Sequence, residues 1–236
     1  MIEDTRTPLD IELTNLGGYH YLSEVLPEGS WKGRSCFIVG GGPSLRQFDF
    51  SLLDGRLSIG INRAFERFWP TILFAMDVRV LNWIRQGLYG EACRQRFEEY
   101  QGLKVWCLLY GAKLPDDVYI VKAFGNFLTS QRQWGTSYAQ GLGTGNNSGY
   151  AALNLAFILG ADPIYLLGYD MKHEGDRSHW HGGHPIKQTV EQVESFRLHF
   201  YRAYRKLRDA GRTVINLNPD SALPRFPKKS WKEALE

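Results

Sequence analysis

Short apolar runs, each ended by glycine or by a polar residue, recur along the chain. They cover residues 36–39, 57–61, 71–76, 104–109, 119–123, 164–168 and 213–218. Runs of this length that are rich in β-branched and aromatic residues are typical of strands buried on both faces. Because both faces of a parallel sheet are covered, the pattern predicts strands of a mainly parallel sheet.

Segments with helical periodicity lie between these runs. Apolar residues stand among charges at helical spacing over 80–100, and they recur every three or four positions over 190–207, before Gly211. Residues 150–159 are almost all apolar, which predicts a helix buried on most sides. The alternation of strands and helices predicts an α/β fold with a variant Rossmann-like sheet and helices on both faces.

The length of 236 residues suits one domain. We expect the Rossmann-like domain over 31–218, preceded by an outer arm at 1–30 that has no clear period. A segment at about 171–188 is expected to act as a lid. The tail at 219–236 contains several prolines, so we expect it to cross the surface.

Composition limits the classes of partner. The 28 basic and 25 acidic residues are well mixed and give a net charge of only +3, so no nucleic-acid partner is expected. The three cysteines are scattered and form no CxxC motif, which favours reduced, buried thiols. No signal peptide or membrane span is expected, so the predicted location is cytoplasmic. The predicted ligands are small molecules. Oligomeric state is not indicated.

The first apolar run ends in Gly40-Gly41-Gly42-Pro43-Ser44. Pro43 suits a first helical turn, and Ser44 can place its hydroxyl beside free amides. Glycines let a ligand approach the backbone, so this turn is a candidate phosphate site with a helix N-terminus behind it. Valine at Gly42 is expected to block a ligand and leave the fold mostly intact. A strand-to-helix turn with no ligand is the alternative.

Other polar residues follow the predicted strands directly. Asn62, Asp77 and Asp170 each come after a strand, and Asn147 or Ser148 can cap the buried helix that starts near residue 150. Parallel strands end at one edge, where ligands bind in such sheets, so we expect these residues to gather there. Asp170 has a second interpretation, because an aspartate after a strand often only caps the following turn.

Four histidines stand close together at positions 173, 179, 181 and 184. His179, His181 and His184 could supply nitrogen ligands to a metal ion, or they could line a polar lid. A single histidine of near-neutral pKa could also take a proton from an acceptor hydroxyl. We favour this role for His184, with His179 second, and predict no metal site.

Several of these motifs together resemble a known group of enzymes. They are Gly-Gly-Gly-Pro-Ser-Leu at 40–45, Asn62, Asn-Ser-Gly at 147–149, Ile-Tyr-Leu-x-Gly-x-Asp at 164–170, and Ser-His-Trp-His-Gly-Gly-His at 178–184. The set resembles the bacterial CMP-dependent sialyltransferases, which have a variant Rossmann fold. It is also similar to the related flagellin-modifying glycosyltransferases and the archaeal 6-hydroxymethylpterin diphosphokinase.

The resemblance implies a role for each matching residue. The loop at 40–44 and Asn62 would contact the nucleotide, with Asn147, Ser148 and Gly149 near its ribose or phosphate. His184 would be the general base. The implied activity is transfer of a sugar from a CMP-sugar or similar nucleotide-sugar donor.

Four features depart from the sialyltransferase pattern. Gly41 replaces an asparagine, Lys172 takes the place of the tyrosine that steadies the leaving phosphate, and Asp77 stands near an expected asparagine. The arginine expected shortly before Ser148-Gly149 is absent. A carboxylate at position 77 would repel a phosphate unless a divalent cation lay between them, which makes Asp77 a catalytic candidate. Two alternatives therefore stay open: a Mg²⁺-dependent diphosphokinase and a non-catalytic nucleotide-binding module.

Overall fold

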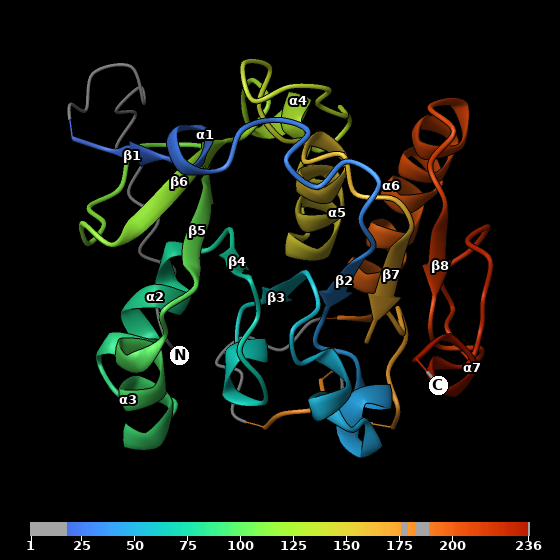
Figure 1. Cartoon of the computed structure of the whole chain (residues 1–236), viewed down its shortest axis with the longest axis horizontal. Coiled ribbons are helices and arrows are strands. Elements are labelled where there is room, and N and C mark those ends of the chain that lie inside the picture. The colour runs from blue at the N-terminus through green and yellow to red at the C-terminus, as the bar shows by residue number, and fades with distance from the viewer. Residues whose placement is uncertain (1–17, 176–178, 183–188, 236) are drawn as a thin grey trace.

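The computed structural model describes residues 18–175, 179–182 and 189–235. In this part of the chain, eight strands form one sheet in the order β1-β6-β5-β4-β3-β2-β7-β8, shown in Figure 1. Every neighbouring pair is parallel. The predicted α/β Rossmann-like fold is therefore confirmed.

The strands coincide closely with the predicted apolar runs. They are β1 (His20–Tyr21), β2 (Cys36–Val39), β3 (Ser58–Ile61), β4 (Ile72–Ala75), β5 (Leu103–Leu108), β6 (Val118–Lys122), β7 (Ile164–Leu167) and β8 (Val214–Asn216). Only β1 was not predicted. It is two residues long and pairs with the edge of β6, so it carries no pattern of its own.

Helices of very different length lie between the strands and after the last one. They are α1 (Leu22–Val25), α2 (Val78–Arg85), α3 (Glu91–Glu99), α4 (Phe127–Ser130), α5 (Ser148–Ile158), α6 (Val190–Asp209) and α7 (Trp231–Leu235). The described residues also form the 3₁₀ helices η2 (Pro43–Gln47), η3 (Phe50–Leu53) and η4 (Ala64–Glu66). Among the described residues, none of the helices has the length and apolar character needed to cross a membrane.

Both faces of the sheet are covered, as alternate side chains of β2 illustrate. Cys36 and Ile38 belong to a core that contains α5 and α6, whereas Phe37 and Val39 pack on the opposite face with η2 and η3. Further along that second face, α2 and α3 lie side by side over β4, β5 and β6. Period-two alternation with apolar residues on both sides explains why these strands have continuous apolar sequences.

Local signals set both ends of α6. Thr189 Oγ1 accepts a hydrogen bond from Gln192 N at 3.3 Å, and Gln192 Oε1 accepts one from Thr189 N at 2.9 Å. This reciprocal capping box satisfies amides that the first turn leaves unpaired. Gly211, with φ of 68°, follows the last turn, as predicted for a helix stop.

The polar loop before α5 is held by a buried side chain. Asn154 of α5 is fully buried, and its Oδ1 accepts hydrogen bonds from Gly135 N at 2.9 Å and Gly143 N at 2.8 Å. Its Nδ2 donates to Gly135 O at 2.8 Å. One asparagine thus satisfies three backbone groups of the loop, which gives this loop a structural role.

Residues after the predicted domain boundary at 218 belong to the same packing unit. Leu223 and Phe226 are buried in the core with α6. Ala222 N donates to Asp170 O at 2.8 Å, and Asn216 N donates to Pro227 O at 2.8 Å. The expectation that the tail only crosses the surface is therefore wrong for these residues, because their apolar side chains complete the core beside β8.

Replacing Asn154 with leucine tests the anchoring of this loop. The side-chain volume is nearly kept, but three buried backbone groups lose their partners, each at about 1–3 kcal/mol. We expect the free energy of unfolding to fall by about 3 kcal/mol or more, measured by urea denaturation. Asn82→Leu, at an exposed position of α2, is the control. Equal stability of the two variants would contradict the anchoring role.

Candidate functional site

The order of strands reverses between β2 and β7. From β2 the chain adds β3, β4, β5 and β6 outward, then returns through α5 and places β7 on the other side of β2. The loops after β2 and β7 leave this point together: Gly40 N donates to Leu167 O at 2.8 Å, and Gly42 N donates to Gly168 O at 2.9 Å. In open parallel sheets such a junction is where ligands bind.

Asp170 joins the two loops at this junction. Its Oδ1 accepts a hydrogen bond from Ser44 N at 3.0 Å, and its Oδ2 accepts one from Ser44 Oγ at 2.8 Å. The residue is only 6% exposed. Burial raises the pKa of Asp170 above its usual value, while the bonds from Ser44 and the nearby charge of Lys172 act in the opposite direction.

Two backbone amides of the predicted phosphate site therefore already have hydrogen-bond partners within the chain. The amides of Gly42 and Ser44, expected to be open, donate to Gly168 O and to Asp170. The helix after the turn is also not the α-helix assumed in the dipole argument, since η2 is a 3₁₀ helix of five residues. Pro43 does begin it, as expected. A phosphate could take these amides only by displacing the bonds now present, and nucleotide contact by this loop stays a prediction.

Gly41 and Gly42 are glycines for different reasons. A Cβ on Gly42 would collide with Asp170 Oδ2 and Gly168 O, so the expectation that Gly42→Val leaves the fold intact is wrong. A Cβ on Gly41 would lie 2.6 Å from Cδ2 of His179, the end of a side chain. The first glycine gives room to His179, and the second lets β2 and β7 end side by side.

Asn62 and Asp77 lie at the same edge of the sheet, as predicted. They follow the parallel neighbours β3 and β4, in which Ile61 pairs with Phe74. Asn62 has a positive φ of 54°, and within the described part of the chain its buried Oδ1 has no hydrogen-bond partner. A buried acceptor without a partner is costly, so it is the best candidate here for contact with a ligand donor.

The Asp77 carboxylate has a partner from its own chain. It caps α2 by accepting from Arg79 N at 2.9 Å, and it forms a two-point ion pair with the Arg79 side chain, with Nη2 2.7 Å from Oδ2. The Arg79 guanidinium group thus balances the negative charge of Asp77, which the sequence led us to expect a divalent cation to balance. Catalysis by Asp77 stays a prediction.

The Asn147-Ser148-Gly149 turn caps α5. Asn147 Oδ1 accepts from Tyr150 N at 3.1 Å, and Gly149 O accepts from the hydroxyl of Tyr169 at 2.9 Å. Tyr169 lies just after β7, so it ties the start of α5 to the strand junction. Asn147 and Ser148 are partly exposed and Gly149 is buried. Lys172 is exposed, two residues beyond Asp170.

Part of the histidine-rich segment lies over the glycine turn. Trp180 N donates to Gly41 O at 2.8 Å, and the rings of His179 and His181 stack with centroids 5.1 Å apart. His184, the favoured general base, lies outside the described residues. In the described ranges, no three histidine, cysteine or acidic side chains are placed to hold a metal ion together.

A small cavity of 130 Å³ lies beside the junction and is lined by Ser44, Gly168, Asn218 and Trp231, among others. Another, of 220 Å³, lies far from the junction beside β1 and β6, and none of the predicted site residues lines it. Because ligand sites for drug-sized molecules are typically about 300–1,000 Å³, the cavity beside the junction is by itself too small for a nucleotide.

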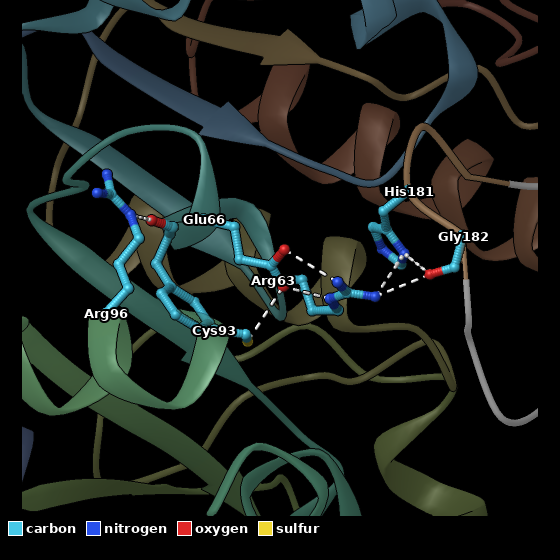
Figure 2. A network of polar contacts seen from close by, with 7 residues as sticks. Arg63, Glu66, Cys93, Arg96, His181 and Gly182 are labelled. Atoms are coloured by element: carbon cyan, nitrogen blue, oxygen red, sulfur yellow. Dashed lines mark hydrogen bonds and ion pairs between the residues drawn. The ribbon is translucent and has the colours of Figure 1, made fainter. Parts of the chain in front are cut away.

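Sequence reasoning overlooked residues that connect this edge. Arg63 follows Asn62 directly, and its local partner Glu66 gives only an ordinary i,i+3 ion pair, whereas its contact with Gly182 spans 119 positions and leaves no local signal (Figure 2). Tyr169 likewise carries no local signal beyond its place at the end of a strand. The histidines and glycines around Trp180 in the sequence give no signal of where that segment packs.

Comparison with known proteins shows a likeness at the level of fold. No protein-family model matches the chain, and no curated protein is significantly similar to it. One similar solved structure is described as a MAf glycosyltransferase from Magnetospirillum magneticum AMB-1, with a TM-score of 0.55 and 16% identity. The match covers 86% of this chain and 34% of that one, so the chain spans about a third of its length. At this identity the likeness shows the fold, which agrees with the Rossmann-like fold that the sequence resemblance implies.

Substituting the two glycines with alanine should separate their roles. Gly42→Ala forces β2 and β7 apart at a packed junction, which should cost about 1–3 kcal/mol. Gly41→Ala only has to displace the His179 ring, so we expect a loss below about 1 kcal/mol. Urea denaturation of both variants measures the difference. A Gly42→Ala protein as stable as the parent would contradict the described junction.

Burial of Asp170 predicts a dependence of stability on pH. The pKa of Asp170 is higher in the folded state than in the unfolded state, so between these two pKa values the native protein binds more protons. The contribution of Asp170 to the free energy of unfolding therefore falls as pH rises through that interval. The Asp170→Asn variant lacks this contribution. Upward from about pH 4, the ordinary range for Asp, the parent should lose stability relative to the variant. Urea midpoints measure this, with the exposed Asp54→Asn as control, and parallel pH curves for parent and Asp170→Asn would refute it.

Proposed function

We propose that this protein is a nucleotide-dependent glycosyltransferase that takes its donor at the junction of β2 and β7. The observation that carries the proposal is this junction, where two loops meet beside the ends of β3 and β4. The arrangement puts the Oδ1 of Asn62, which has no hydrogen-bond partner among the described residues, close to the strand ends where ligands bind in open parallel sheets.

The fold likeness supports the same class of reaction. The similar structure is described as a glycosyltransferase, and the sequence resemblance independently assigns the motifs at 40–45 and 147–149 to nucleotide contact. A CMP-sugar is the donor that the sequence resemblance implies. The Asp77–Arg79 ion pair favours sugar transfer over the Mg²⁺-dependent diphosphokinase alternative, because Asp77 already has a cationic partner.

The proposed reaction is a substitution at the anomeric carbon. The acceptor hydroxyl oxygen forms the new bond to that carbon, and the bond from the carbon to the phosphate oxygen breaks, so the nucleotide leaves with the electron pair. The hydroxyl proton passes to a histidine, His184 in the first instance or His179. Exclusion of water by the segment over Gly41 would limit hydrolysis of the donor.

Nucleotide binding and metal dependence test the proposal together. Thermal unfolding is measured with CMP, CDP, UDP, GDP and ATP, each with Mg²⁺ and with EDTA, since a ligand that binds the native state raises Tm. We expect a cytidine nucleotide to raise Tm without Mg²⁺, and the matching nucleotide sugar to be turned over. A Tm rise confined to ATP with Mg²⁺ would favour the diphosphokinase alternative. Nucleotide binding without turnover would favour the non-catalytic module.

Histidine variants test the chemical step. His184→Ala should lower kcat by about a hundredfold or more, the usual range for removal of a general base, with little change in donor affinity. His179→Ala is tested beside it, and His20→Ala, on exposed β1, is the control. An unaltered kcat in both site variants would reject the histidine mechanism.

A further inference from the structure

Arg63 connects the end of β3 with the histidine-rich segment (Figure 2). Its Nη1 donates to Gly182 O at 2.8 Å and lies 3.4 Å from Nδ1 of His181. The Arg63 side chain is only 11% exposed. A largely buried cation is therefore directed at the main chain of this segment, beside the predicted nucleotide contact Asn62.

The guanidinium group is held from behind. Glu66 forms a two-point ion pair with Nε and Nη2, the latter at 2.9 Å from Oε2. The guanidinium carbon of Arg63 lies 4.3 Å from the centroid of the Tyr89 ring. A bidentate carboxylate and an aromatic face together fix the plane of the fork, which the single ammonium of a lysine could not reproduce.

The carboxylate of Glu66 is positioned in turn by α3. Cys93 Sγ donates to Glu66 Oε1 at 3.2 Å, and burial together with Glu66 raises the pKa of Cys93 to about 12, so the thiol keeps its proton. Arg96 Nε donates to Phe65 O at 2.6 Å and so ties η4 to the same helix. The residues that hold Arg63 in place thus belong to the folded core and not to residues 179–182, which Arg63 contacts.

The segment is attached to β2 at a second point. Trp180 N donates to Gly41 O at 2.8 Å. The centroid of the Trp180 ring lies 6.4 Å from the centroid of the Phe50 ring and 5.5 Å from the guanidinium carbon of Arg67. Residues 179–182 therefore run from the end of β2 to the end of β3. Two anchors define where His179 and His181 stand above the strand ends.

We propose that Arg63 is a positioning residue that seats residues 179–182, and with them His179 and His181, above the donor site. The proposal rests on the function proposed above. The segment lies directly on the glycine turn, where Trp180 N donates to Gly41 O, so its position decides which side chains stand above a donor bound at that turn. A rigid hydrogen-bond donor aimed at the main-chain oxygen of Gly182 holds the segment in one place for the chemical step.

Two variants test directly whether Arg63 positions residues 179–182. Arg63→Met removes the charge and the fork, and Arg63→Lys keeps the charge but not the fork. Hydrogen exchange at the Trp180 amide reports whether the segment stays on Gly41, because local opening sets that rate. We expect exchange at Trp180 to accelerate at least about tenfold in both variants, with protection of the strands unchanged. Arg94→Met, which disrupts only an exposed ion pair with Glu91 and Glu98 on α3, is the matched control.

Kinetics then separate positioning from binding. We expect both Arg63 variants to lower kcat at least about tenfold and to leave the donor dissociation constant nearly unchanged, because the loss is one of geometry in the reacting complex. Parental kcat in Arg63→Lys would show that charge alone suffices and would overturn the argument.

The two proposals can fail separately. Unchanged exchange at Trp180 in the variants overturns the role of Arg63, whatever activity the parent has. A parent protein that turns over no nucleotide sugar overturns the proposed function, while accelerated exchange would still support the seating of the segment by Arg63. If Arg63→Met does not fold, Arg63→Lys carries the test, since it keeps the cation beside Glu66.

Discussion

The parallel pairing of β2 with β7 is the constraint on which the rest of this structure depends. Two strands far apart in the sequence have to end side by side, which requires residues without a Cβ at Gly40 and Gly42. Asp170 then closes the gap by accepting both hydrogen bonds of Ser44. A buried carboxylate is stable here only because both of its oxygens have hydrogen-bond donors.

The same constraint decides which polar groups at the site already have partners. Groups that could meet a ligand are paired within the chain: Ser44 has Asp170, Asp77 has Arg79 and Arg63 has Glu66. Binding at this edge would exchange hydrogen bonds rather than fill empty ones, so the net free energy of each new contact would be small. The Oδ1 of Asn62, which has no partner in the part of the chain that the structure describes, is the exception, since a ligand donor there would remove a cost already present.

Much of the fold could be predicted because its signals are local. Each apolar run became a strand, the helix at 190–209 stops before Gly211, and Asn147 caps α5 as expected. The gathering of Asn62, Asp77 and Asp170 at one edge followed from parallel topology alone. The prediction failed where a short turn had to be interpreted in isolation: the residues after Gly42 form a 3₁₀ helix of five residues, and the Ser44 amide at its start donates to the distant Asp170.

By itself, the sequence determined the strands, the main helices, their stops and the edge to which the site residues belong. These follow from hydrophobic period, caps and glycines, which act over a few neighbouring residues. Only the tertiary structure decided which polar group serves which: Ser44 lies 126 positions from Asp170, and Arg63 lies 119 positions from Gly182. Partners that distant leave no periodic trace, because a hydrogen bond depends on where the folded backbone places two atoms and not on how far apart their residues stand in the chain.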